Sequence, residues 1–581
     1  MNNSRIISTA QNPDLVTTTI LVNGTELSSR YPVKSIVVNN ELNRIPYAQL
    51  AVLDGDPASQ DFELSNTDLL IPGSEIEILT GYHNDEQVIF KGIVIKHSIK
   101  IREGFSGLFV ECKDVFVKMT VGRKSAYFYE SSDAEIMEEL VSKYGDLSID
   151  AEATETIHPQ MVQFEASDWD FMMLRAQANG KITWVENGSI SIKAPGIDQE
   201  PLETVAFGAN IINFDGEIDA RNQLEKISAK SWNATDQELI EVDAADQGVA
   251  LNGNLTKSQL AEVIDLDDLQ LRHGGHMPDV ELQSWADSKS LFQELSRIRG
   301  RVKVQGTDTI KPDTVLKLEG VGDRFNGNIY VSGVRHEITS GNWTVDAQFG
   351  LDPKWFSETF EVNTPPASGI LPAISGLQIG MVTQLQDDPE GEDRILVRLP
   401  IINQEQEGTW ARVALLDAGN NRGSFFRPEI DDEVIVGFIN DDPNDAVVLG
   451  GLHSSANAAP LETSDDNHEK GFVTRSGITF LFNDEKKSVI ITTPDGREFT
   501  LNDDAGEILI KDGQHSIKLS DSGIDLESAA DINLKATGDI NMEGKNINVK
   551  ANLQLKAEGA SGAEFSSSAI AVVKGSLVQI N

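Results

Sequence analysis

The chain has 581 residues, too many for a single hydrophobic core, so we expect three or four domains. It carries 48 Lys and Arg against 92 Asp and Glu, a net charge of −44 at pH 7. Because phosphate binding relies on clustered cations, this balance argues against a nucleic-acid partner. The sequence has no apolar run of membrane-span length, and its N-terminal stretch lacks the pattern of a secretory signal, so we expect synthesis in a cytoplasm.

Cys112 is the only cysteine, which excludes an internal disulfide and Cys–Cys metal spacing. It lies in the strand-like run LFVECKDVFV. We therefore expect it to be a small buried apolar residue.

The first block, residues 1–361, combines strand patterns with a few helices. Alternating apolar segments separated by Gly, Asn and Asp predict strands over most of it. Apolar spacing predicts helices over residues 131–145, 166–180 and 282–300, and the first begins with capping-box spacing at Ser132 and Glu135. This block reads as β-rich α+β.

A linker rich in Pro, Gly, Ala and Ser, residues 362–376, leads to a second β block over residues 377–460. Six short strand-like segments without a helix signal predict a Greek-key barrel of OB type. From Leu371 to Pro460 there are five Arg, no Lys and fifteen Asp or Glu, so the cationic groove of an oligonucleotide reader is missing. We interpret the barrel as a structural adaptor, followed by a polar connector over residues 461–476.

The last part, residues 477–581, is built from short repeats with apolar side chains at every second position. Units such as DINLKATG and NINVKA leave room for one strand and a sharp corner, without a returning hairpin. One ribbon of such strands cannot bury its apolar side alone. The chain either coils on itself as a β-solenoid or joins two further copies around a shared axis, and the small to medium apolar residues favour the trimer.

The trimer predicts a needle of about a dozen strand layers, on the order of 60 Å long. Its core is predicted to contain eight apolar side chains of the repeats: Ile532, Leu534, Ile540, Met542, Ile547, Val549, Leu553 and Leu555.

The order of these parts resembles the Vgr (VgrG) family, the spike proteins of type VI secretion and of related phage-tail-like contractile injection systems. The resemblance covers almost the whole chain. It is carried by SLFQELSRIRGRVKVQG and the residues that follow it up to Phe356, and by the barrel stretch GTWARVALLDAGNNRGSFFRPEIDDEVIVGFINDDPNDAVVLGGL, from Gly408 to Leu452.

The resemblance implies a fold that is mainly β with some α: tube-like β-barrel hub domains, an OB-fold barrel and a C-terminal triple-stranded β-helix in a homotrimer. It implies that the trimer caps a hexameric inner tube and pierces the target envelope when the outer sheath contracts, delivering cargo. Implied partners are inner-tube and baseplate proteins, a PAAR-type tip protein and effector cargo, with only mechanical contact to the target membrane. The implied place is an assembled injection particle, and whether the particle leaves the cell stays open.

The resemblance also implies a blunt tip at the end of the chain. The alternating residues there would leave an apolar triangular platform for a capping partner, and they are Leu577, Val578, Gln579, Ile580 and Asn581. The alternative is that these residues only complete the last layer.

No catalytic, cofactor-binding or metal-binding residue is predicted. His273 and His276, in the motif HGGH, lack further ligands at suitable spacing and read as a surface turn. His336 alternates with apolar strand residues, which favours a packed or solvent-facing histidine. Carboxylate pairs such as Asp441–Asp442 and Asp431–Asp432 lie in turn contexts. The connector is too short for the lysozyme-like domain of some phage spikes, and no toxin domain is expected after Asn581.

Two other classes of protein remain as alternatives. A trimeric polysaccharide-degrading tailspike needs long coils of about 20 or more residues with acidic and aromatic residues along a groove, whereas these repeats have six to eight residues. A passive fibre adhesin would not need the hub-like first block.

Overall fold

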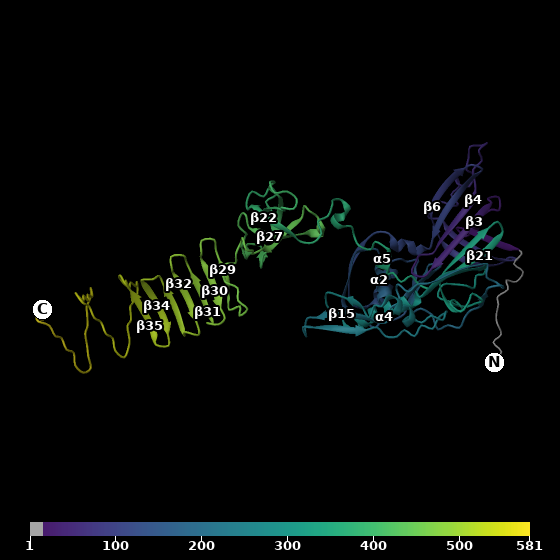
Figure 1. Ribbon diagram of the computed structural model, residues 1–581. Helices are drawn as coiled ribbons and strands as arrows, with labels where there is room; N and C mark the ends of the chain where they lie inside the picture. The colour runs from purple at the N-terminus through teal and green to yellow at the C-terminus, as the bar shows by residue number, and fades with distance from the viewer. Residues whose placement is uncertain (1–14, 581) are drawn as a thin grey trace. The chain divides into compact units, whose positions relative to one another are not determined.

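The computed structural model describes residues 15–580. It divides the chain into two compact units, Met1–Ala373 and Ile374–Asn581, which Figure 1 shows in purple to teal and in green to yellow. Strands dominate both units and the helices are few, which confirms the predicted mainly β fold with some α.

A single sheet of 13 strands forms the centre of the first unit. Along it the strands follow the order β14-β18-β21-β20-β3-β4-β7-β6-β5-β1-β2, and β19 joins β13 to β20. Their bounds are β1 Val16–Val22, β2 Thr25–Glu26, β3 Val33–Glu41, β4 Tyr47–Leu53, β5 Glu75–Tyr82, β6 Asp85–Arg102, β7 Phe105–Lys113, β13 Thr204–Ala206, β14 Asn213–Ile218, β18 Ile298–Gln305, β19 Val315–Glu319, β20 Gly327–Thr339 and β21 Asn342–Phe349.

One face of this sheet carries the main hydrophobic core. Alternate residues of its strands, such as Val38, Leu50 and Val110, are fully or almost fully buried together. Cys112 belongs to the same core, as the sequence predicts. Burial raises the pKa of the Cys112 thiol to about 12, because the thiolate would have to form in an apolar environment.

Three smaller sheets complete the first unit. Their strands are β8 Lys124–Ser132, β9 Ser148–Ala151, β10 Ile157–Ala166, β11 Ile182–Glu186, β12 Ser189–Lys193, β15 Ile227–Asn233, β16 Glu238–Asp243 and β17 Leu269–Arg272. Strands β8 and β10 form a ribbon, β9 pairs with the hairpin β11–β12, and β15 lies between β16 and β17.

The described part of the first unit has five α-helices and two 3-10 helices. They are η1 Val115–Thr120, α1 Asp133–Ser142, α2 Asp168–Ala178, α3 Lys257–Ile264, α4 Asp279–Leu295, α5 Phe356–Thr359 and η2 Pro366–Gly369. Of the five α-helices, α1, α2 and α4 lie where the apolar spacing predicts a helix. The capping box at the start of α1 is present, with Ser132 and Glu135 bonded reciprocally. The sequence analysis did not identify α3, although Thr256 and Gln259 form a second capping box at its start.

The second unit begins with a closed barrel of five strands in the order β22-β23-β24-β28-β27. They span β22 Gln378–Gln384, β23 Ile395–Arg398, β24 Thr409–Val413, β27 Glu433–Phe438 and β28 Ala446–Gly451. The fourth of the six strand-like segments in chain order, GSFFRPEI at residues 423–430, is not a barrel strand, since residues 424–430 form no strand. A small hairpin of β25 Ala418–Gly419 and β26 Arg422–Gly423 precedes them, and the turn η3 Ile439–Asp441 follows β27.

An antiparallel meander of seven strands follows the barrel (Figure 1). Its strands are β29 Glu469–Val473, β30 Thr479–Asn483, β31 Ser488–Thr492, β32 Glu498–Asn502, β33 Glu507–Lys511, β34 His515–Ser520 and β35 Gly523–Ser528. Each strand pairs with the next in sequence through a returning hairpin. The expectation of strands without returning hairpins is therefore wrong up to Ser528.

Residues 531–580 form no helix or strand, and none of these described residues makes a backbone-to-backbone hydrogen bond. The triple-stranded β-helix thus stays a prediction. No helix in the part of the chain from residue 15 to residue 580 is both long and apolar enough to cross a membrane.

Candidate functional site

The most distinctive surface of the second unit is one face of the meander. Paired residues of neighbouring antiparallel strands point to the same side of a sheet, so the register defines two columns of side chains. The first column is Phe480, Ile491, Phe499, Ile510, Ile517 and Leu526. The second is Phe482, Val489, Leu501, Ile508, Leu519 and Ile524. We call these twelve residues the apolar face.

Within the described residues 15–580, no layer of the chain covers the apolar face. Every member except Val489 is exposed, from 36% for Phe480 to 70% for Ile524. A single large apolar side chain at a surface is ordinary, but a contiguous patch of this size on a monomeric protein marks an interaction surface.

The opposite face of the meander mixes apolar, polar and charged side chains. Its central column reads Leu481, Ile490, Thr500, Leu509, Lys518 and Asp525. Ion pairs join neighbouring strands on this side, between Lys511 and Glu498 at 3.1 Å and between Lys518 and Glu507 at 2.6 Å. The two faces therefore differ in polarity, because all twelve residues of the apolar face are apolar and the opposite face carries these charged pairs.

The first column of the apolar face continues toward the barrel. Phe472 of β29 pairs with Phe480, and their ring centroids are 6.5 Å apart. The ring of Phe426, in the loop between β26 and β27, stacks on Phe472 at 5.3 Å. An ion pair between Arg475 and Glu429 at 2.8 Å lies nearby in the sequence. The apolar surface thus extends without a break from the meander to a barrel loop.

The eight predicted core residues of the needle all lie in the segment without strands. Each is more than half exposed in the single chain, from 54% for Ile540 and Ile547 to complete exposure for Leu553. The chain itself brings none of them into a core, so their role stays a prediction. Of the predicted tip residues, 577–580 are exposed to differing degrees, and Asn581 lies outside the described residues.

The sequence analysis placed the core of the needle in the repeats after residue 531 and did not identify the apolar face. The sequence signal for the apolar face was the alternation of apolar and polar residues in TFLFN, EFTLN, EILIK and HSIKLS. What the alternation alone does not give is the strand register, which aligns these residues into two columns.

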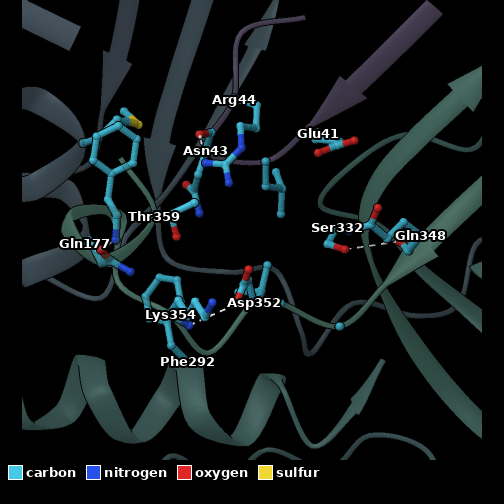
Figure 2. Close-up of a pocket in the computed structure, with 15 residues that line it drawn as sticks. Glu41, Asn43, Arg44, Gln177, Phe292, Ser332, Gln348, Asp352, Lys354 and Thr359 are labelled. Carbon is cyan, nitrogen blue, oxygen red and sulfur yellow. Dashed lines mark hydrogen bonds between the residues drawn. The ribbon is translucent and has the colours of Figure 1, made fainter. Parts of the chain in front are cut away.

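A cavity of about 200 Å³ in the first unit is a second candidate (Figure 2). Arg44 and Asp352 approach it from different loops, and burial lowers the pKa of Arg44 against the opposing effect of Glu41 and Asp352. Gln177 of α2 accepts a hydrogen bond from the backbone of Phe356 at 2.8 Å. Among the described residues that line it there is no histidine, cysteine or tyrosine. The cavity lies where the segment after β21 packs against α2 and α4, and we interpret it as a gap in this packing.

The histidines singled out in the sequence do not form a site. The described part of the chain holds no group of three or more His, Cys, Asp or Glu side chains placed to bind a metal. His273 and His276 are exposed, and the His273 ring contacts the Gly275 carbonyl. His336 is buried against Trp343, whose Nε1 donates to the His336 Nδ1 at 3.3 Å. Burial lowers the pKa of His336 to about 4.

A buried charge cluster joins the helices of the first unit. Asp133 of α1 accepts two hydrogen bonds from Arg175 of α2, which also pairs with Glu281 of α4 at 2.7 Å. His158 lies 3.1 Å from Asp133. Burial would raise the pKa of Asp133, but the hydrogen bonds and charge of Arg175 outweigh it and hold that pKa below its usual value. This cluster ties three helices together, and the cavity described above does not include it.

A large β-rich unit, a closed five-stranded barrel and an amphipathic meander with an unpartnered face define a class of protein whose work is assembly. Comparison with known proteins identifies the class. Residues 12–340 match the family model of the Alg8 N-terminal domain. Residues 378–453 match that of the type VI secretion system/phage-baseplate injector OB domain.

Curated relatives are spike proteins. The chain is 26% identical over 196 residues to the type VI secretion system spike protein VgrG1b of Pseudomonas aeruginosa, covering 32% of this chain and 26% of that protein. It is 31% identical over 105 residues to the spike protein VgrG3 of Vibrio cholerae, covering 16% of this chain and 10% of that protein. The matches thus span about a quarter and a tenth of the lengths of these relatives.

The solved structures that the comparison matched include tail and VgrG proteins. The 43 kDa tail protein of prophage MuSo2 from Shewanella oneidensis is 10% identical, with 58% of this chain and 98% of that chain covered and a TM-score of 0.44. A Francisella PdpA–VgrG complex is 10% identical, with 88% of each chain covered and a TM-score of 0.40. Since one family model covers more than half of the sequence, the chain belongs to the Alg8 N-terminal domain family. Its barrel matches an injector OB domain, and its curated matches are type VI secretion spike proteins.

Proposed function

We propose that the chain is the central hub and spike of a contractile injection machine. As a homotrimer it caps the inner tube, and on sheath contraction it is driven through the target envelope and delivers cargo. The observation that carries this proposal is the apolar face, which follows an injector-type barrel directly and has no cover within the described part of the chain.

Self-association of the meander follows from its chemistry. A sheet with an uncovered apolar face needs a second apolar surface to exclude water, and identical copies supply matching faces. Closure around a symmetry axis uses all of these faces and leaves none exposed. Three sheets around one axis form a prism with the ion pairs outside.

The segment of residues 531–580 supports the same arrangement. Its alternation of apolar and polar residues is that of strands, yet the described residues of this segment make no backbone-to-backbone hydrogen bond. Neighbouring copies that each supply one strand per layer would pair those groups and bury Ile532, Leu534 and their equivalents. We infer a triple-stranded β-helix there, and an apolar platform at Leu577–Ile580 that receives a PAAR-type tip protein.

The proposed division of labour follows the chain: residues 1–361 are the hub, 362–376 a linker, 377–460 the barrel, 461–476 a connector and 477–581 the needle. The boundary between the two compact units, after Ala373, falls within the proposed linker. Strand β29 begins at Glu469, so the connector also supplies the first meander strand. Inner-tube and baseplate proteins are the proposed partners of the hub.

We propose that the chain performs no catalysis and needs no cofactor. The relatives are described as spike proteins, and the buried Asp133 pairs with Arg175, which also pairs with Glu281. The chain is proposed to be made in a cytoplasm and to act within an assembled particle.

The proposal is tested in the native source by replacing the chain with a variant that ends after residue 476. Electron micrographs of sheathed particles, labelled for this chain, should show the label at the spike end of intact particles. The shortened variant should give particles that lack a needle and deliver nothing. Particles that assemble and deliver normally with the shortened chain would contradict the proposal. Reproducible glycan hydrolysis by the purified chain, lost on substitution of a carboxylate, would favour the tailspike enzyme instead.

A further inference from the structure

Six cations on the large sheet of the first unit share one property: none forms an ion pair with a carboxylate of the described chain within 4.0 Å. They are Lys34, Lys91, Lys96, Lys100, Arg102 and Lys113, which we call the basic strip. All but the half-buried Lys113 are exposed.

Most cations elsewhere in the first unit have a carboxylate partner. Examples are Arg301 with Asp215 at 2.9 Å and Lys311 with Glu186 at 2.8 Å. In a chain with nearly twice as many acidic as basic residues, a cluster of cations without such partners runs against the general charge balance.

The strand register places the five cations of β6 and β7 on one side of the large sheet, and Lys34, at a bulge of β3, reaches that side through its contact with Phe105. Val94 of β6 pairs with Cys112 of β7, and both point into the core. Because side chains alternate, Lys113 points to the outer face. The pairs Lys96–Glu111, Lys100–Gly107 and Arg102–Phe105 lie on that face too.

A β-bulge at Ile95 keeps the later cations of β6 on the same face of the sheet as Lys91. The register shifts between Val94 and Lys96, so that one extra residue separates the two halves of β6. Without it, Lys96, Lys100 and Arg102 would turn toward the core side. With it, they continue the row begun by Lys91, which pairs with Glu77 of β5.

Two aromatic rings lie beneath two cations of the basic strip. The Nζ atoms of Lys34 and Lys100 lie 4.1 and 4.0 Å from the ring centroids of Phe105 and Phe109. These contacts hold the cations above the sheet and leave their outer sides free. They also cover the rings, so the rings are not available to stack bases as single-stranded nucleic acid requires.

Three glutamates share this face, and a fourth, Glu103, follows Arg102 in the hairpin turn. Glu75 pairs with Ile93, which lies opposite Lys113. Glu111 and Glu77 are cross-strand neighbours of Lys96 and Lys91, and neither forms an ion pair with them. At an ionic strength of 0.1 M, charges are screened beyond about 10 Å, so a partner near the strip responds to its local charge and not to the net charge of the whole chain.

We propose that the outer face of the hairpin β6–β7 binds an extended acidic segment of a partner protein. Along a strand, residues i and i+2 are about 7 Å apart, which matches the spacing of alternate carboxylates on an extended polypeptide. Arg102 adds a forked guanidinium suited to a carboxylate. This surface lies in the first unit and shares no residue with the apolar face.

The test measures binding of fluorescently labelled poly-L-glutamate to the full chain by anisotropy in 0.1 M salt. The strip variant is Lys100→Glu/Arg102→Glu. The matched control is Arg272→Glu/Arg324→Glu, since both arginines are exposed, contact only the amide side chains of Gln270 and Asn254, and give the same change in net charge.

We expect the strip variant to bind at least about tenfold more weakly, while the control binds as the unmodified chain does. Lys100→Gln/Arg102→Gln replaces the strip variant if the charge reversal prevents folding. Absence of binding by the unmodified chain, or an equal loss in the control, would overturn the proposal. Tighter binding of duplex DNA or of phosphatidylserine vesicles would also overturn it, because the strip would then serve a nucleic acid or a membrane.

Discussion

His336 shows how a single buried side chain couples the stability of the first unit to pH. Its ring lies against Trp343 and accepts that residue's indole N–H. Burial lowers the pKa of His336 from 6.5 to about 4, so the unfolded chain takes up a proton in a pH range where the folded chain does not. Stability from this group is therefore complete above about pH 6.5 and is lost as the pH falls toward 4.

We predict that His336→Gln, which keeps an acceptor for Trp343, reduces this acid sensitivity. Between pH 7 and pH 4.5 the unmodified chain should lose on the order of 2 to 3 kcal/mol more unfolding free energy in its first unit than the variant does. Calorimetric unfolding of both proteins across this range measures the difference. Identical pH dependence would show that His336 titrates normally in the folded state.

At the scale of single residues, local chemistry was enough for several predictions. Cys112 is buried, and Ser132 with Glu135 begins a helix, because both depend on sequence neighbours or on simple alternation. The ion-pair cluster around Arg175 was not foreseen. It joins residues 133, 158 and 281, which are far apart in the sequence. A short-range sequence pattern does not predict contacts between such residues.

At the scale of elements, the meander shows what the alternation of apolar and polar residues does and does not determine. This alternation correctly predicted strands up to Ser528, but it did not predict that consecutive strands are joined by hairpins. Turn signals were present, such as Asp495–Gly496 and Asp512–Gly513 between consecutive strands. After Ala530 the units become shorter and these turns disappear, and so do the paired strands.

The apolar face gives a prediction within a single strand. Ile508→Asp should place one unpaired charge per copy in the shared core, which costs several kcal/mol each, and prevent assembly. Leu509→Asp is the matched control, because it puts the same charge on the opposite face, beside Lys518, one residue further along β33. Sedimentation velocity of both variants measures the outcome. Assembly of the Ile508 variant, or equal disruption by the Leu509 variant, would show that the face is not the interface.

The needle segment allows the corresponding experiment. Ile540→Asp or Leu555→Asp should prevent trimer formation or abolish its resistance to heat, whereas Asn541→Asp, adjacent to Ile540, should have little effect. Thermal unfolding monitored together with molar mass measures both quantities. An Ile540 variant that stays trimeric with unchanged heat resistance would mean that this side chain does not point to the axis.

At the scale of the whole molecule, the order of parts was readable from the sequence because each part has its own pattern. The mainly β fold, the barrel and the relation to spike proteins follow from the strand patterns and from the stretches around Phe356 and Gly408. The number of copies does not follow from one chain. The apolar face shows only that a cover is required, since two sheets or three sheets can both supply it.

The mass of the intact chain in solution tests the central claim most directly. Native mass spectrometry or sedimentation equilibrium should give three times 63.4 kDa, about 190 kDa, at concentrations near 1 μM. A species of 63.4 kDa whose meander is folded would contradict self-association, and one of twice that mass would contradict the threefold prism.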